Sequence, residues 1–218
     1  MSGFPWELIG SSLSLWLKED GLTRSAVGWA GLIFAVYAVN FLWAPLVDRL
    51  RLPYLTDRLG HRKSWILLMQ GLILVCLLAW SVLAPSVNIT LVIGAGLLIA
   101  ICSATQDITI DALRIEQIEK EDTAAMAAGA SVAVIGWWSG FKIGGLIALM
   151  VADNFEMMGI ENYWQMTFIL LGGIVILCNI GLLFIPEVGT EERQKAQAVA
   201  QANFQQKLGG DSLLSQAT

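Results

Sequence analysis

Charged residues are scarce in this sequence. Only 14% of its 218 residues are Asp, Glu, Lys or Arg, whereas soluble domains carry about 25%. Hydrophobic residues make up 56% of the chain, and the mean hydropathy is +0.66. This composition excludes an ordinary soluble domain and indicates an integral membrane protein.

Cysteine and histidine are also rare, and they are scattered. Cys76, Cys102 and Cys178 lie in separate apolar runs without a C-x-x-C spacing, and the single histidine, His61, lies in a short basic loop. A metal or redox centre needs clustered ligands, and a nucleic-acid site needs a larger basic surface. We therefore expect no enzyme active site, no metal or other cofactor, and no nucleic-acid partner.

The sequence does contain long apolar runs. They approach the length of about 20 residues with which a helix crosses about 30 Å of hydrocarbon. They lack the alternation of barrel strands, which favours an all-α integral membrane protein with a six-helix bundle over residues 1–186. The expected spans are 4–17, which is only partial, then 26–47, 64–84, 89–113, 124–152 and 163–185. The polar residues 187–218 are expected to form a tail or the start of a linker.

Basic residues gather on one side of this expected bundle. They are Arg49, Arg51, Arg58, Arg62, Lys63, Arg114, Lys120, Arg193, Lys195 and Lys207. The opposite side carries only Lys18 and Arg24, together with an acidic loop after the fifth span. The positive-inside rule places the basic side in the cytoplasm. An even number of spans then puts both chain termini there too.

Two aspartates interrupt the fourth apolar run. Asp107 and Asp111 are four residues apart, so they share one face of a helix. A charged side chain at the bilayer centre costs about 2.5–3.5 kcal/mol on insertion scales, and such residues mark transport pathways. Burial disfavours the ionised form, so the deeper Asp107 is a candidate for proton coupling or substrate contact. Asp111 is shallower and has a second interpretation, as an ion-pair partner of Arg114 or Arg49.

Three further polar or aromatic features lie at membrane depth. Gln106 has the chemistry to hydrogen-bond a sugar or peptide group, or a neighbouring helix. Lys142 needs a counter-ion, water or an anionic ligand. A carboxylate of a substrate, a static pair with Asp107 or Glu7, and simple snorkelling all remain open for it. The adjacent side chains Trp137 and Trp138 are candidates for stacking on a sugar ring in a cavity, or for ordinary packing.

Small residues follow one face of the fifth span. Gly136, Gly140 and Gly144 recur at every fourth position. This spacing lets helices approach closely. It is compatible with static packing and with a sliding surface.

The loop between the second and third spans combines acidic residues, a glycine and basic residues in a fixed order. Such a cluster resembles the cytoplasmic loop motif of the major facilitator superfamily, and a plain positive-inside anchor is the alternative. The residues of the motif are Asp48, Arg49, Asp57, Arg58, Gly60, Arg62 and Lys63.

Three segments sharpen this resemblance. They read S-G-F-P from residue 2 followed by S-L-S-L-W from residue 12, F-L-W-A-P-L-V-D-R over 41–49, and C-S-A-T-Q-D-I-T-I-D-A over 102–112. Together they resemble the N-terminal half of the AmpG-type muropeptide permeases, in the peptide/acetyl-coenzyme A/drug transporter group. The resemblance runs from about residue 2 to residue 186. Two features depart from the expected pattern: Glu7 lies in the partial span, where an apolar residue is expected, and Trp137-Trp138 stand where family members often have Tyr-Arg.

The resemblance implies a bacterial inner-membrane transporter built from two six-helix halves, of which this chain is the first, with its first helix truncated. It implies import of anhydro-muropeptides together with protons. The implied partners are a small-molecule substrate, protons, the lipid bilayer, and a C-terminal half or a second copy of the chain. Another cargo, such as an acyl-coenzyme A, a pterin or a drug, and a six-helix scaffold without transport are the alternatives.

Overall fold

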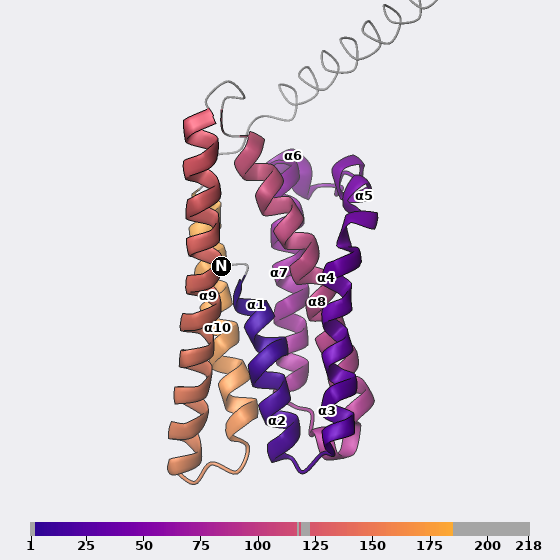
Figure 1. The fold of residues 1–218 in the computed structure, drawn as a ribbon, viewed down its shortest axis with the longest axis vertical. Coiled ribbons are helices and arrows are strands. Elements are labelled where there is room, and N and C mark those ends of the chain that lie inside the picture. The colour runs from indigo at the N-terminus through magenta and orange to yellow at the C-terminus, as the bar shows by residue number, and fades with distance from the viewer. Residues whose placement is uncertain (1–2, 117, 119–122, 185–218) are drawn as a thin grey trace, which may run out of the picture.

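The computed structural model describes residues 3–116, 118 and 123–184, and every regular element in this part of the chain is a helix. Figure 1 shows these helices running side by side along one long axis. The expected all-α fold is therefore confirmed. Lys120, the basic residues after the sixth span and the polar segment 187–218 lie outside the described residues.

Five segments of the described chain are long and apolar enough to cross a membrane. They are Arg24–Leu42, His61–Trp80, Pro85–Glu116, Thr123–Met157 and Tyr163–Leu182. The last four correspond to helices α7 (His61–Trp80), α8 (Pro85–Glu116), α9 (Thr123–Met157) and α10 (Tyr163–Leu183). The expectation of five full spans agrees with this finding.

The first helical segment is shorter and has three parts. These are α1 (Gly3–Glu7), the π-helical η1 (Leu8–Ser12) and α2 (Leu13–Glu19). Figure 1 shows α1 beginning part-way along the bundle rather than at its end. This segment overlaps the range 4–17, for which a partial span is expected.

The expected span 26–47 is not one regular helix. It consists of α3 (Arg24–Ala30), the 3-10 turn η2 (Gly31–Phe34), α4 (Ala35–Val39), the 3-10 turn η3 (Asn40–Leu42) and α5 (Ala44–Arg49). Pro45 occupies the first turn of α5. Because proline lacks an N–H and its ring clashes with the carbonyl group four residues earlier, a new helix starts here.

Other helix ends also differ from the sequence-based ranges. Helix α7 ends at Trp80 instead of residue 84, and α8 begins at Pro85 instead of residue 89. Asn88 has non-helical backbone angles and kinks α8 near its start. Helix α9 continues past Ala152 to Met157.

A buried aromatic group joins the helices at the end of the bundle opposite α6 (Leu55–Leu59). The side chain of Trp80 is fully buried, with its ring centroid 6.0 Å from that of Trp16 and 5.1 Å from that of Phe168. Its indole N–H donates to the carbonyl oxygen of Val92 at 3.0 Å. These contacts fix α2, α7, α8 and α10 relative to one another, so the polar residues of α8 lie toward the other end.

The two ends of the glycine stripe on α9, Gly136 and Gly144, have different surroundings. A Cβ atom on Gly144 would lie 2.5 Å from Cδ2 of Phe4, so glycine is what lets α1 pack here. A Cβ atom on Gly136 would meet nothing within 4 Å. One end of the stripe is therefore in close helix contact, and the other borders open space.

Candidate functional site

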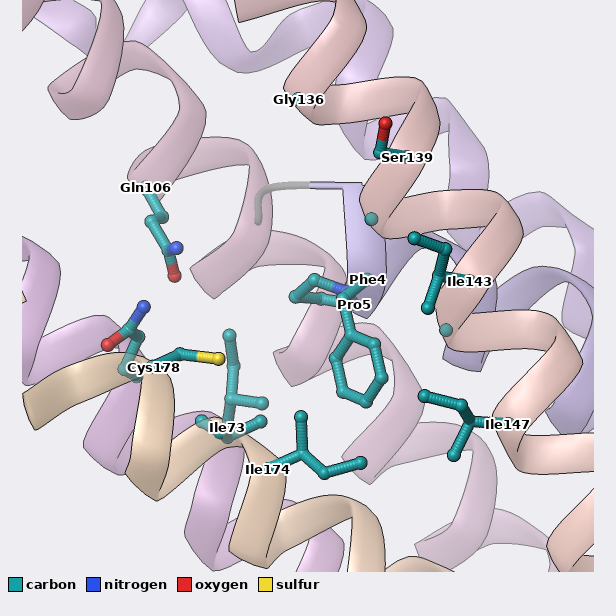
Figure 2. A pocket seen from close by; sticks show the side chains of 14 residues that line it. Phe4, Pro5, Ile73, Gln106, Gly136, Ser139, Ile143, Ile147, Ile174 and Cys178 are labelled. Carbon is teal, nitrogen blue, oxygen red and sulfur yellow. The ribbon is translucent and has the colours of Figure 1, made fainter. Parts of the chain in front are cut away.

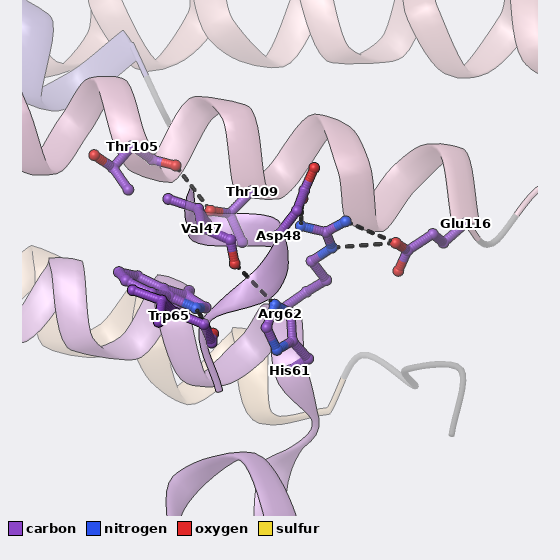
Figure 3. Close-up of polar contacts among 9 residues, drawn as sticks. Val47, Asp48, His61, Arg62, Trp65, Thr105, Thr109 and Glu116 are labelled. Carbon is purple, nitrogen blue, oxygen red and sulfur yellow. Dashed lines mark hydrogen bonds and ion pairs between the residues drawn. The ribbon is translucent and has the colours of Figure 1, made fainter. Parts of the chain in front are cut away.

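The loop motif converges on one buried arginine. Figure 3 shows Arg62 reaching two carboxylates from different helices, Asp48 in α5 and Glu116 at the end of α8. The guanidinium nitrogens lie 2.5 Å from Oδ1 of Asp48 and 2.8 Å from Oε1 of Glu116. Lys63 is also buried, whereas Arg49, Asp57 and Arg58 are exposed. The motif thus ties α5, α7 and α8 together through Arg62.

Gly60 makes the turn that brings α7 into this position. Its backbone angles, φ 92° and ψ 166°, belong to a region that is essentially restricted to glycine. Beyond the turn, a ring nitrogen of His61 is hydrogen-bonded to the carbonyl oxygen of Val47 at 3.0 Å. The indole N–H of Trp65 donates to the carbonyl oxygen of Leu50, also at 3.0 Å. The start of α7 is therefore held against the end of α5.

Replacing Gly60 with alanine is expected to lower the free energy of unfolding by about 1–3 kcal/mol, because a Cβ atom strains this backbone conformation. The control is Gly71→Ala in the middle of α7, where a Cβ atom would meet nothing within 4 Å. It is expected to be neutral or to stabilise by up to about 1 kcal/mol. Thermal unfolding of the detergent-solubilised variants measures both effects. Equal destabilisation of the two variants would contradict the assigned role of Gly60.

A cavity between α8 and α9 gathers several of the predicted residues. It has a volume of about 390 Å³, and Asp107, Asp111, Arg114 and Trp137 line it. The guanidinium of Arg114 lies 3.0 Å from Oδ1 of Asp111 and donates to the carbonyl oxygen of Gly129 at 3.0 Å. Asp111 is exposed and Asp107 is half-buried. We call this space the aspartate cavity.

A second, largely apolar cavity of about 310 Å³ adjoins it, and Gly136 lines both. Figure 2 shows Gln106 projecting into it from α8, opposite the isoleucines of α9. Gln70 of α7 also lines it. The side-chain oxygens of Gln70 and Gln106 are buried without a hydrogen-bond partner among the described residues. These two amides give the apolar cavity its polar end.

Lys142 lies outside both cavities. Its ammonium nitrogen lies 5.4 Å from the ring centroid of Phe141 and 5.9 Å from that of Trp138, within cation–π range. Neither Lys142 nor Trp138 lines either cavity. Among the described residues, Lys142 forms no ion pair with Asp107 or Glu7. The ring of Trp137, in contrast, stacks on Phe141 at 5.8 Å beside the aspartate cavity.

Comparison with known families identifies the architecture. Residues 1–215 match the family described as Major Facilitator Superfamily. The chain belongs to the major facilitator superfamily.

Relatives place this superfamily member near the AmpG transporters. It is 35% identical over 192 residues to "Putative transporter AmpG 4" of Rickettsia felis, an alignment that covers 88% of this chain and 44% of the relative. It is 32% identical over 186 residues to "Anhydromuropeptide permease" of Escherichia coli K12, covering 85% of this chain and 35% of the relative. The resemblance drawn from the sequence motifs is confirmed. The chain spans less than half the length of these relatives.

Two polar partners in this superfamily member escaped the sequence analysis. Glu116 completes the environment of Arg62, although it lies far along the chain. Thr105 accepts a hydrogen bond from the indole N–H of Trp43 at 3.0 Å and so links η3–α5 to α8. Both are pairings between helices, and a single sequence carries no signal for them beyond the residue type.

Proposed function

We propose that this chain is the N-terminal half of a secondary active transporter that imports anhydro-muropeptides together with protons across the bacterial inner membrane. The observation that carries the proposal is the aspartate cavity, where carboxylates, a guanidinium and an indole ring meet inside a member of the major facilitator superfamily. The name of the Escherichia coli relative supports the choice of cargo. The two cavities together offer aromatic, amide and charged groups, a combination that suits a solute with both sugar and peptide groups.

Each lining group has chemistry that fits such a cargo. The indole of Trp137 can stack on a sugar ring, and the amide of Gln106 can hydrogen-bond hydroxyl or peptide groups. Arg114 offers a fork of N–H donors to a carboxylate. Asp107 binds the proton, since it is the less exposed of the two carboxyl groups that line the aspartate cavity. Lys142 attracts anionic cargo from outside the cavity.

Alternating access supplies the transport cycle. In this scheme one six-helix bundle rocks against a second bundle around a site near the membrane midplane. The second bundle is a C-terminal half or another copy of this chain, which accords with the coverage of less than half of each relative. The basic loop between α5 and α7 faces the cytoplasm, as do both termini, in agreement with the positive-inside rule. There the Asp48–Arg62–Glu116 cluster stabilises one state.

Uptake measurements test this function directly. The chain is produced in Escherichia coli cells that lack their own anhydromuropeptide permease, alone and together with the C-terminal half of that permease. Uptake of labelled anhydro-muropeptide that collapses on addition of a protonophore is the expected result in at least one case. Uptake of an acyl-coenzyme A, a pterin or a drug instead would change the cargo. A stable cross-linked homodimer without any uptake would favour a scaffold.

A further inference from the structure

A second carboxyl group is buried in the bundle, and the transport scheme above does not use it. Glu7, the last residue of α1, is only 1% exposed. It packs directly on α9: a Cβ atom added to Gly145 would lie 3.0 Å from Cγ and 3.1 Å from Oε1 of Glu7. The glycine therefore makes room for this carboxyl group at the contact between the two helices.

The backbone after Glu7 is shaped to give it a polar neighbour. Residues Leu8–Ser12 form a π-helical turn, in which hydrogen bonds join residues five apart. This register places Ser12 over Glu7, whereas in a regular α-helix residues five apart point in different directions. The hydroxyl oxygen of Ser12 lies 3.2 Å from both carboxyl oxygens of Glu7. Single π-helical turns of this kind occur frequently at functional sites.

Burial of Glu7 favours a neutral carboxylic acid, because a carboxylate loses its hydration there and the serine hydroxyls replace only part of it. A serine hydroxyl has one proton, so Ser12 can donate to only one oxygen of an ionised Glu7 at a time. The hydroxyl of Ser11 also lies beside the carboxyl. No ion pair joins Glu7 to any cation of the described chain. A protonated Glu7, in contrast, can itself donate to the hydroxyl oxygen of Ser12.

Several titratable groups lie on the segments packed against α1 and η1. They are Cys102, Asp107, Asp111, Arg114 and Glu116 on α8, Lys142, Asp153 and Glu156 on α9, Lys18 and Glu19 on α2, and Tyr37 on α4. Lys142 is the cation one helical turn before Gly145, and its ammonium lies against aromatic rings instead of pairing with Glu7. The contact is thus arranged without a compensating positive charge.

We propose that Glu7 is a proton-binding site, neutral while α1 and η1 pack on α9 and ionised when this contact opens to water. Ionisation would leave a poorly compensated charge against Gly145, so loss of the proton loosens the contact. Proton uptake closes it again. The link to transport rests on the proposed function, whereas the protonation of Glu7 is a property of the chain itself.

Infrared spectroscopy of the purified chain in lipid nanodiscs tests the protonation without any substrate. A protonated carboxyl group has a carbonyl absorption that is well separated from that of a carboxylate. We expect this absorption near neutral pH, a loss of one carboxyl's intensity in Glu7→Gln, and no such loss of the same component in Asp107→Asn. Ser12→Ala keeps the carboxyl group but removes its hydrogen-bond partner, so the same component is expected to move to higher frequency.

The outcomes separate this proposal from the transport function. Absence of a protonated-carboxyl absorption near neutral pH, or an absorption unchanged in both Glu7→Gln and Ser12→Ala, would overturn it. If Glu7→Gln does not fold, the frequency shift in Ser12→Ala still decides. A chain that shows the Glu7 absorption but never transports would leave the proton site standing and reject the transport function alone.

Discussion

Replacing Asp107 with asparagine is expected to remove the dependence of uptake on the proton gradient. Asparagine keeps the size of the side chain and its hydrogen-bonding capacity, but it cannot bind and release a proton at physiological pH. The initial uptake rate should fall at least about tenfold, equivalent to about 1.4 kcal/mol in the rate-limiting barrier. Labelled anhydro-muropeptide uptake, measured at several external pH values in the complemented cells, is the readout.

Asp111→Asn is the matched control for this experiment. Asp111 lies one helical turn away on the same helix and lines the same cavity, but it is exposed and already paired with Arg114. Its replacement should therefore reduce uptake less and preserve the response to pH. Undiminished, pH-dependent uptake by Asp107→Asn would remove Asp107 from the coupling mechanism. An equal loss in both variants would point to the cavity's net charge instead of one proton carrier.

The bundle was largely predictable from the sequence, because the thickness of a bilayer sets the length of an apolar helix. The breaks in the second span were not anticipated, although Pro45 is a sequence signal for the one before α5. Whether a proline kinks or ends a helix depends on the surroundings of the backbone carbonyl group that its ring displaces. The π-helical turn after Glu7 has no comparable signature in the sequence.

The candidate site was predictable only in part. Asp107 and Asp111 share a cavity because residues four apart share a helix face, which the sequence states directly. Trp137 joins them and Lys142 does not, and this difference depends on the rotation of α9 about its axis. Helix α9 carries apolar or small residues almost all around. Such a helix gives no indication of which side faces its neighbour.

Replacing Arg62 with glutamine is expected to destabilise the protein more than replacing any other charged residue of the loop motif. Removing one partner of a buried ion pair costs about 3–5 kcal/mol, and exposed pairs contribute about 0–1 kcal/mol. The side chain of Arg62 is 5% exposed, while those of Asp48 and Glu116 are 47% and 25% exposed. We therefore expect an intermediate loss of about 2 kcal/mol, measured by thermal unfolding in detergent.

Arg58→Gln is the control, since Arg58 is exposed and in no ion pair within the described chain. It should change the stability by less than about 0.5 kcal/mol. The double variant Arg62→Gln/Glu116→Gln should be less destabilised than the two single losses added together, because Glu116 no longer carries an unpaired charge. Strict additivity, or an Arg62→Gln loss no larger than that of Arg58→Gln, would contradict the cluster. A coupling energy between Arg62 and Glu116 would show that α7 and α8 are joined at the end that carries the loop motif. Helices that move as one bundle in an alternating-access cycle need such a connection.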